Sequence, residues 1–279
     1  LCTENKQQIK SKDITGYWYR RSDLNIGPHS LESKADSSEL EHQLRRYLLH
    51  EYSGLKEAIH HILDTKRNVN SIFYSSINKK LQLIEASKAD LLIPDTLVTT
   101  QKKDILFFLK KHHKVITKSI VNAPRFFLKD DENNELTYLS YTNSFSTDLD
   151  DMDEHFSPTL LQEQLDKEIE LRIFFLDNKF WTMAIFSQLD EKTKVDFRKY
   201  NITKPNRNLP YDLPQEIEHK LSRLMKKLRL NCGSIDLIYT KKGEYVFLEV
   251  NPVGQFGMVS SPCGFNLERE LAKYLSKSV

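Results

Sequence analysis

Long apolar runs are missing from this sequence, and no stretch approaches the roughly 18 consecutive apolar residues that a membrane-spanning helix needs. The N-terminus also lacks the charged and then apolar segments of an export signal. A strong excess of one charge is missing too, because 41 Lys and Arg residues face 39 Asp and Glu residues. Without a global field, any binding to nucleic acid or to an anionic membrane would have to be local. We therefore expect a soluble, cytoplasmic protein with neither nucleic acid nor membrane as its partner.

Cysteine is scarce, and Cys2, Cys232 and Cys263 form no framework of regular spacings. This usage suits a reducing compartment, where disulfides are rare. The chain opens on Leu1 rather than Met, so we expect part of its native beginning to be missing. A chain of 279 residues is long enough to bury a sizeable core and to divide into two or three lobes.

The N-terminal half alternates between helical and strand-like segments. The aromatic alternation in "GYWYRRSDL" (16–24) predicts a short strand that ends in two arginines. Apolar residues at helical spacing over 38–64 predict one long helix, or two helices with a break at Gly54. Two segments that each read as a helix followed by a strand come next, and Pro94 marks a predicted domain boundary between them.

The C-terminal half contains a hairpin signal and another amphipathic helix. The acidic run "DLDDMDE" (148–154) has no periodicity and predicts a solvated loop. Two apolar strands joined at Asp177-Asn178 predict a hairpin, and the segment 201–214 reads as a loop rich in proline and asparagine. Asp212 and Pro214 open a helix whose predicted apolar stripe consists of Ile217, Leu221, Leu224 and Leu228.

Near the C-terminus, "GSIDLIYTKKGEYVFLEVNP" (233–252) predicts two strands around a turn at Lys242-Gly243. One register gives a uniformly apolar face and also places Asp236 directly opposite Glu249. Asn251 shares the acidic face because side chains alternate along a strand. The expected apolar pairs are Ile235 with Val250, Leu237 with Leu248, and Tyr239 with Val246.

Two opposed carboxylates, with Cβ atoms about 5 Å apart, repel each other, so one must bind a proton or both must share a cation. Two carboxylates and an amide from Asp236, Glu249 and Asn251 suit Mg²⁺, with nucleotide phosphates completing its coordination. The alternative is that the acids merely flank a solvent-facing hairpin. Ile238 and Phe247 are expected on the same face, and these apolar side chains favour the floor of a partly buried cleft.

These residues resemble a known family. Asp236 followed by "LEVNP" resembles the metal-binding signature that closes ATP-grasp domains. The tail "EVNPVGQFGMVSSPCGFNLERELAKYL" (249–275) is similar to the ATP-grasp peptide maturases of the graspetide (microviridin-like) family, and the likeness extends through "YWYRR", "VITKS", "LLQEQLDKEIELRIFFL" and "VDFRKYN". The resemblance implies an α/β (α+β) ATP-grasp fold with an N-terminal pre-ATP-grasp domain (1–92), a central lid-like subdomain (93–163) and a C-terminal antiparallel-sheet subdomain (164–279).

The resemblance also implies site residues. Lys79 and Lys118 would contact ATP phosphates, and Arg172 would face the γ-phosphate; Lys118 and Arg172 are the candidate catalytic residues. Each has an alternative, because the lysines could be ordinary surface residues and Arg172 could pair with Glu170. The expected Mg²⁺ ligands are Asp236, Glu249 and Asn251, the expected adenine-binding hinge is Gln162, Glu163, Gln164 and Leu165, and the expected peptide contacts are Arg20, Arg21, Asp196 and Arg198.

One segment departs from the family. ATP-grasp enzymes often carry a glycine-rich loop over the phosphates, but no glycine occurs between Lys118 and Phe145. We therefore expect another loop, around Tyr141 and Thr142, to close over the phosphates.

The activity that the resemblance implies is an ATP-dependent macrocyclisation. Asp or Glu side chains of a ribosomal precursor peptide, with leader and core, would be activated as acyl-phosphates and joined to Ser or Thr hydroxyls or to Lys amines. A homodimer is also implied. The alternatives are a ligase that adds amino acids to a peptide tail, a non-catalytic nucleotide- or peptide-binding partner, and a kinase-like phosphotransferase. No His or Cys stands out as a general base.

Overall fold

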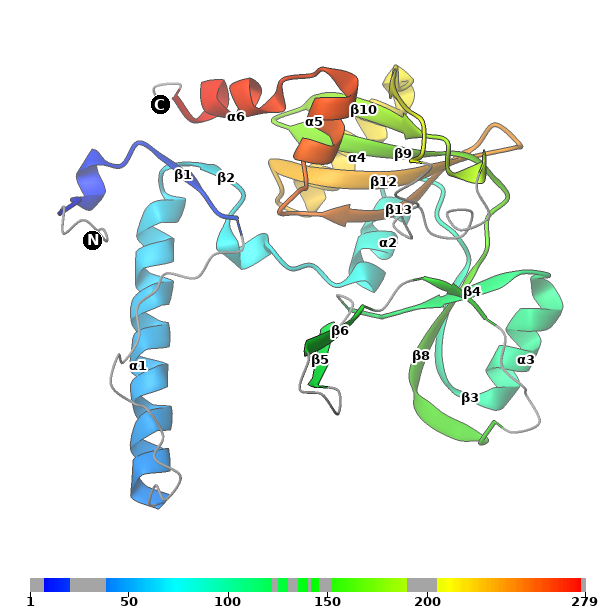
Figure 1. Ribbon diagram of the computed structural model, residues 1–279, viewed down its shortest axis with the longest axis horizontal. Helices are drawn as coiled ribbons and strands as arrows, with labels where there is room; N and C mark the ends of the chain where they lie inside the picture. Colours follow the sequence, from blue (N-terminus) through cyan, green and yellow to red (C-terminus); the bar gives the residue numbers. More distant parts are fainter. Residues whose placement is uncertain are drawn as a thin grey trace. The chain divides into compact units, whose positions relative to one another are not determined.

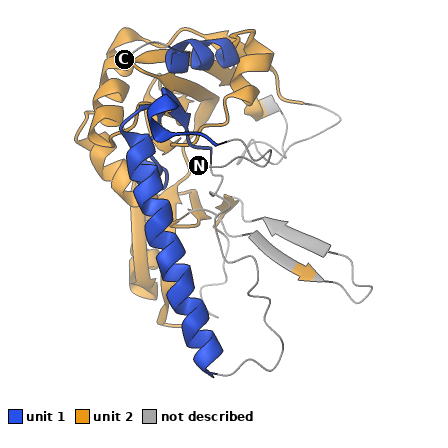
Figure 2. Ribbon diagram, turned by 90° about the vertical axis from the view of Figure 1, so that its left-hand side faces the viewer, with its two compact units in different colours: residues 1–76, 267–279 blue, residues 77–266 orange. Residues whose placement is uncertain are grey.

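Two compact units make up the computed structural model of the chain (Figure 1 and Figure 2). Unit 1 comprises residues 1–76 and 267–279, and unit 2 comprises residues 77–266. The sequence predicts a three-part division instead, and that division stays a prediction. The structure describes residues 8–20, 39–121, 125–129, 135–139, 142–145, 152–189 and 205–276.

Unit 1 contains one long helix, α1 (Glu39–Asp64), which runs through Gly54 without a break. This finding confirms the single-helix alternative. Strands β1 (Gly16–Trp18) and β2 (Arg67–Val69) pair in parallel, and α6 (Leu267–Ser276) contacts both of them. The unit also includes the 3₁₀ helices η1 (Ser11–Asp13) and η2 (Ile72–Tyr74).

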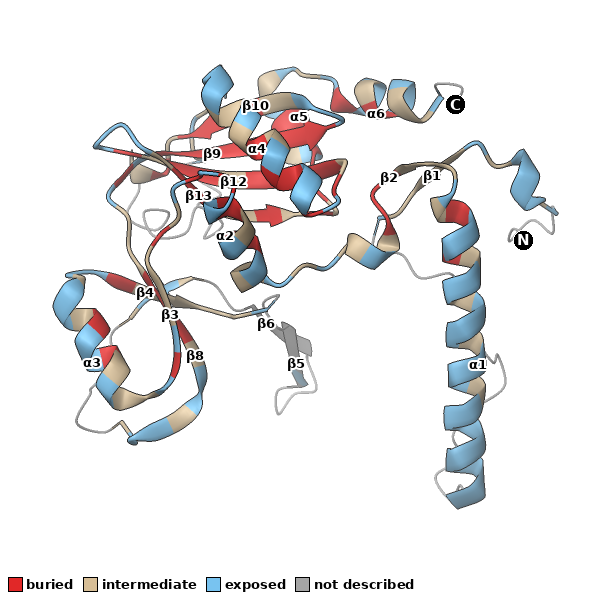
Figure 3. Ribbon diagram, turned by 180° about the vertical axis from the view of Figure 1, so that it is seen from behind, coloured by how far each residue is buried: buried red, intermediate tan, exposed pale blue. Residues whose placement is uncertain are grey.

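The larger sheet of unit 2 has the strand order β11-β10-β9-β12-β13, and all neighbours are antiparallel. Helices α4 (Gln215–Lys227) and α5 (Gly257–Cys263) lie on opposite faces of this sheet (Figure 1 and Figure 3). The central strands β9 and β12 are buried along most of their length, as expected for strands covered on both faces (Figure 3). The strands are β9 (Lys167–Leu176), β10 (Lys179–Ile185), β11 (Asn208–Tyr211), β12 (Cys232–Thr240) and β13 (Tyr245–Asn251).

The smaller sheet of unit 2 has the strand order β3-β8-β4-β7. Helix α3 (Lys102–Lys111) follows β3 directly and contributes Ile105 and Phe108 to a core that also contains Val115 and Leu161. The strands of the smaller sheet are β3 (Thr96–Gln101), β4 (Val115–Lys118), β7 (Asn143–Ser144) and β8 (His155–Glu163). The other elements of unit 2 are the antiparallel pair β5 (Arg125–Lys129) and β6 (Glu135–Leu139), the helix α2 (Lys79–Ser87) and the 3₁₀ helix η3 (Ser187–Leu189).

Turn chemistry explains the hairpin between β9 and β10. Asp177 and Asn178 have φ values of 50° and 63°, and positive φ at both central residues is typical of a type I′ turn. Asn and Asp tolerate this region better than other residues with a Cβ atom. The hairpin predicted at Asp177-Asn178 is confirmed.

The hairpin of β12 and β13 also matches its prediction up to a point. Ile235 lies opposite Val250, and Asp236 lies opposite Glu249. Beyond Asp236 a β-bulge shifts the register by one residue, with Leu248 as the extra residue on β13. A bulge places two residues of one strand opposite one of the partner, and it breaks the simple alternation of faces.

The bulge overturns the rest of the predicted pairing. Phe247 was expected on the acidic face, but it lies opposite Leu237 and is fully buried. An alternating apolar pattern cannot reveal one extra residue, so the sequence alone favoured an unbroken ladder. The observed pairs are Leu237–Phe247, Ile238–Val246 and Tyr239–Tyr245, in place of the expected Leu237–Leu248 and Tyr239–Val246.

Strand β11 shows that a second prediction was wrong, because its residues were expected to lie in a loop. It pairs with β10 at the edge of the larger sheet and contains Pro210. Proline cannot donate a hydrogen bond and is tolerated on an edge strand, where one side of the backbone faces away from the sheet. The same proline made a loop the more natural prediction.

The predicted α+β character is confirmed, since helices pack on antiparallel sheets throughout unit 2. Within the described part of the chain, no helix has both the length and the apolar character needed to cross a bilayer.

Gly233→Ala should destabilise unit 2. A Cβ atom at Gly233 would lie 2.9 Å from Val250 Cγ2 and 3.3 Å from the Met225 methyl, so the core between β12, β13 and α4 would be overpacked. We expect the free energy of unfolding to fall by about 1–3 kcal/mol, measured by urea denaturation. The matched control is Gly257→Ala, where no atom lies within 4 Å of the added Cβ. Equal effects of the two substitutions would contradict this account of the packing.

Candidate active site

A row of three charged side chains crosses the larger sheet of unit 2. Asp236 on β12 has Arg172 on β9 as its partner on one side and Glu249 on β13 on the other. Directly opposed residues in antiparallel strands project from the same face, so the three side chains share one face. Asn251 lies opposite Ser234 on that face. The strand register thus brings together the two acids and the amide that the sequence analysis grouped.

Arg172 and Asp236 form a buried ion pair. Arg172 Nη1 donates to Oδ1 and Oδ2 of Asp236, at 2.7 and 2.5 Å. Only 8% of the Arg172 side chain and 15% of the Asp236 side chain are exposed. Arg172 Nε is buried too, and it has no partner among the described residues. The guanidinium therefore brings a permanent charge and an unused donor to this face.

A second cation lies beside Glu249. Lys79 Nζ is 3.0 Å from Glu249 Oε2, and both side chains are at least three-quarters buried. Lys79 is the first residue of α2, because the Asn78 side chain caps the helix by accepting from the Lys80 and Leu81 N–H groups. Each of the two opposed acids thus has its own cationic side chain. The sequence pattern predicts a bound proton or a shared metal ion between the acids and does not reveal this arrangement.

A third ion pair on the same face was also missed. Glu170 Oε1 accepts hydrogen bonds from Lys167 Nζ at 2.7 Å and from Ser187 Oγ at 2.6 Å. Burial raises the pKa of Glu170, which outweighs the opposing effects of Lys167 and Ser187, and the charge of Asp236 raises it further. The alternative in which Arg172 pairs with Glu170 is therefore wrong, since Arg172 bonds to Asp236.

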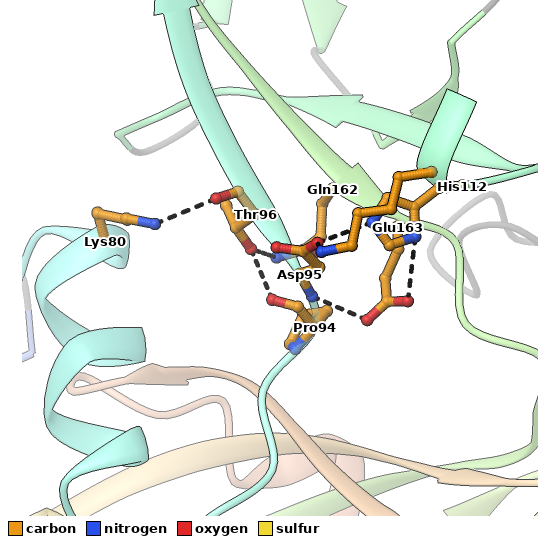
Figure 4. A network of polar contacts seen from close by, with 8 residues as sticks. Lys80, Pro94, Asp95, Thr96, His112, Gln162 and Glu163 are labelled. Carbon is orange, nitrogen blue, oxygen red and sulfur yellow. Dashed lines mark hydrogen bonds and ion pairs between the residues drawn. The ribbon is translucent and has the colours of Figure 1, made fainter. Parts of the chain in front are cut away.

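The predicted adenine hinge starts with the last two residues of β8, and the side chains of those two residues are held by protein contacts (Figure 4). Glu163 Oε1 accepts from the Asp95 N–H at 2.8 Å, and Glu163 Oε2 lies 3.6 Å from His112 Nδ1. Gln162 is buried and donates to Thr96 Oγ1 at 2.8 Å. These side chains brace the hinge against the segment that leads into β3.

Asp95 is the centre of that bracing network (Figure 4). Its Oδ2 lies 2.5 Å from Lys111 Nζ and 2.8 Å from His112 Nε2. The Gln164 N–H donates to the Lys114 carbonyl at 2.9 Å, and Leu165 is half-buried. Asp95 and His112 carried no local sequence signal, because their hinge partner Glu163 lies far along the chain.

The remaining predicted residues are placed in part. Lys118 ends β4 opposite Leu160 and is half-buried. In unit 1, the guanidinium carbon of Arg20 lies 4.9 Å from the centre of the Trp18 ring. Thr142 is half-buried. Arg21, Tyr141, Asp196 and Arg198 lie outside the described residues, so the predicted peptide contacts and phosphate loop stay predictions.

The donor set suits a hard cation bound together with phosphate. The described residues contain no cluster of three or more His, Cys, Asp or Glu side chains that could hold a metal ion. Asp236, Glu249 and Asn251 instead offer two carboxylates and an amide, all with oxygen donors on one face. Mg²⁺ is typically held by one or two carboxylates, with substrate phosphates and waters in its other positions. Arg172 and Lys79 contact these acids and bring positive charge to the same face, so the donor set fits a Mg²⁺-bound nucleotide.

No protein-family model and no curated protein matches the chain. Among solved structures, the macrocyclase MdnC from Microcystis aeruginosa MRC, crystallised with its precursor peptide MdnA, is 30% identical. The match covers 99% of this chain and 82% of MdnC, with a TM-score of 0.74. The chain belongs to the graspetide family of ATP-grasp peptide maturases.

Two further structures support the graspetide assignment. An ATP-grasp ligase associated with ribosomal peptide biosynthesis in Chryseobacterium gregarium, solved with ADP and a leader and core peptide, is 25% identical, with a TM-score of 0.73 over 98% of this chain and 78% of that one. MdnB from Microcystis aeruginosa MRC is 25% identical, with a TM-score of 0.71 over 98% and 81% of the two chains. The predicted ATP-grasp fold and graspetide family are confirmed. This protein is an ATP-grasp ligase that cyclises peptides.

Asp95→Asn should change the pH dependence of stability. Lys111 and, to a lesser extent, His112 lower the pKa of Asp95 in the folded protein. A lowered pKa means that the ionised carboxylate stabilises the folded state above its ordinary pKa of about 3.9, and that this contribution is lost as the pH falls through the lowered value. We expect wild type and Asp95→Asn to differ most in free energy of unfolding above about pH 5 and to converge below about pH 4. Urea titrations across this range test it, and a pH-independent difference would contradict it.

Proposed function

We propose that this graspetide enzyme transfers the γ-phosphoryl group of ATP to Asp or Glu side chains of a ribosomal precursor peptide, which forms acyl-phosphates and releases ADP. A Ser or Thr hydroxyl, or a Lys amine, of the same peptide then attacks the acyl carbon, and phosphate leaves as an ester or amide ring closes. The observation that carries the proposal is the row of Arg172, Asp236 and Glu249 on one face, with Lys79 beside it. MdnC is described as bound with a precursor peptide, and the Chryseobacterium ligase with ADP, leader and core, which supports the same substrate class.

Asp236, Glu249 and Asn251 would hold Mg²⁺ in this scheme. Bound Mg²⁺ would neutralise phosphate charge and orient the β- and γ-phosphate oxygens. The side chains contribute geometry: β12 sets the position of Asp236, and β13 sets the positions of Glu249 and Asn251 on the same face.

Arg172, Lys79 and Lys118 would contact the phosphates. A carboxylate that attacks a polyanion needs the negative charge around the transferring phosphoryl group to be cancelled, and fixed cations do this without reorganisation. Arg172 is suited to the task because its guanidinium is held by Asp236 and still has a buried Nε donor without a partner among the described residues. Lys79 borders a carboxylate of the proposed metal site, so it could contact a phosphate oxygen bound to the same ion.

The segment from Gln162 to Leu165 would bind adenine. Because the side chains of Gln162 and Glu163 are engaged with Thr96, Asp95 and His112, adenine would be read by the hinge backbone. This mode needs a rigid hinge, which the bracing network supplies.

The peptide leader would dock away from the reacting groups, by strand addition or through contacts with residues such as Arg20, Arg21, Asp196 and Arg198. A homodimer is proposed from the family resemblance, and size-exclusion chromatography with light scattering tests it. The cytoplasm is the proposed compartment, since Cys232 and Cys263 are free thiols.

Product mass separates this function from its alternatives. Each ring formed removes the mass of one water from the peptide, whereas a ligase that adds amino acids raises the mass. A kinase-like enzyme would leave a stable phosphate on the acceptor, and a non-catalytic partner would release no ADP. A short reading frame beside the gene that encodes a peptide rich in Thr, Ser, Glu and Asp would supply the substrate.

Glu249→Gln should abolish Mg²⁺- and ATP-dependent dehydration of the precursor peptide, because the amide offers a neutral and weaker ligand to the metal. Mass spectrometry of the peptide measures rings, and fluorescence anisotropy measures peptide binding, which should persist. Glu244→Gln removes a charge from the same hairpin at an exposed turn and should leave cyclisation unchanged. Water loss by Glu249→Gln at the wild-type rate would refute the metal role of Glu249.

Arg172→Lys should keep the fold but lose turnover. Lysine preserves the charge beside Asp236 but loses part of the hydrogen bonding, so we expect the free energy of unfolding to fall by about 1–3 kcal/mol. It lacks the planar fork of donors, and we expect peptide-dependent ADP release to fall by about 100-fold. Arg223→Lys, at an exposed arginine that pairs with Asp90, is the control and should turn over normally. Near-normal ADP release by Arg172→Lys would show that only the charge matters.

A further inference from the structure

Strand β13 lies at the edge of the larger sheet, so its outward backbone groups need partners outside the sheet. The Phe247 N–H donates to the Leu92 carbonyl at 2.8 Å. Further along the strand, the side chain of Gln82 on α2 bonds to both the N–H and the carbonyl of Val250. Helix α2 lies beside β13 (Figure 1) and contacts it, so the Gln82 side chain reaches the part of this edge that contains Val250.

The side-chain amide of Gln82 forms hydrogen bonds to both backbone groups of Val250. Gln82 Oε1 accepts from the Val250 N–H at 2.7 Å, and Gln82 Nε2 donates to the Val250 carbonyl at 3.0 Å. That N–H belongs to the peptide group shared with Glu249, and that carbonyl belongs to the peptide group shared with Asn251. The two bonds therefore fix both peptide planes around Val250, and with them the directions in which the Glu249 and Asn251 side chains leave the strand.

The burial of α2 departs from a simple hydrophobic expectation at Gln82, which is buried together with Leu83 and Ala86. Gln82 is 2% exposed, whereas the neighbouring Leu81 is 55% exposed. Burying a polar side chain costs free energy unless its groups are hydrogen-bonded, and Gln82 Nε2 also contacts the Ile77 carbonyl at 3.2 Å. A primary amide offers a donor and an acceptor on one planar group, whereas an ionised Glu only accepts, Lys only donates and Met has no N–H or O–H donor, so none of these three could make both bonds to Val250.

The β-bulge explains why β13 needs support at this point. The extra residue, Leu248, directly precedes Glu249 and interrupts the ladder between β12 and β13. Contacts from β12 alone therefore fix this part of the strand less firmly. Gln82 binds the edge of β13 that faces away from β12. Lys79, three residues earlier on α2, contacts Glu249 itself.

We propose that Gln82 is a positioning residue for the Mg²⁺ site. It touches neither metal nor nucleotide, and it acts by holding the backbone between Glu249 and Asn251. The inference rests on the metal site proposed above. Helix α2 would then hold the backbone of β13 in addition to placing Lys79 beside Glu249.

The test is the affinity for ADP with saturating Mg²⁺ and with EDTA, measured by isothermal titration calorimetry on the full chain. The ratio of the two affinities reports the metal site without turnover. Substitutions of residues that hold metal ligands in place typically weaken metal sites by 10–100-fold, so Gln82→Met should lower this ratio by about tenfold or more while leaving the ADP affinity in EDTA unchanged. A merely structural glutamine would lower the melting temperature without changing the ratio.

Tyr245→Phe is the matched control, because it removes a half-buried hydrogen bond at the far end of the same strand, between the Tyr245 and Tyr211 hydroxyls at 2.6 Å. Its ratio should equal that of wild type. If Gln82→Met is too unstable to titrate, Gln82→Asn keeps the amide one methylene short of Val250 and should give an intermediate ratio. An unchanged ratio in the Gln82 variants overturns the positioning role alone, whereas a ratio of one in wild type overturns the proposed metal site together with it.

Discussion

The antiparallel register of β12 between β9 and β13 is the constraint on which the site depends. Strands in a sheet lie about 4.8 Å apart, so the register holds Arg172, Asp236 and Glu249 side by side at spacings that the backbone dictates. Like charges this close inside a protein are costly unless cations accompany them. The register therefore gathers charge at one place, and the two acids of the row need cations beside them to offset their repulsion.

On this face, three acids are each paired with a cationic side chain. Glu170 has Lys167, Asp236 has Arg172 and Glu249 has Lys79. Buried ion pairs add little net stability compared with apolar residues of similar size, so stability is a weak reason for three of them. The proposed function would give them a chemical role, since a phosphoryl transfer between anions needs fixed positive charge and a metal site close together.

Local patterns were enough to predict the helices and hairpins. Helix α4 followed from its apolar stripe, the turn at Asp177-Asn178 from residues that accept positive φ, and the pairing of Asp236 with Glu249 from the alternation on both sides of a turn. The bulge at Leu248 and strand β11 were missed because an extra residue and an edge proline leave no periodic signal.

The site was predictable only as a set of residue types. Sequence grouped Asp236, Glu249 and Asn251, but it could not tell which cation contacts which acid, since Lys79 and Glu249 meet only after α2 docks on β13. The link from Gln82 to Val250 spans 168 residues, and it depends on a strand edge that no local pattern describes. Contacts of this kind are decided by tertiary packing rather than by propensity or spacing.

Anomalous scattering from Mn²⁺, in crystals grown with ADP, tests the central claim most directly. The account predicts one peak within coordination distance of carboxylate oxygens from both Asp236 and Glu249, near Asn251 and bridged to the ADP phosphates. A peak bound elsewhere on the chain, or bound nucleotide with no metal between those two acids, would contradict it.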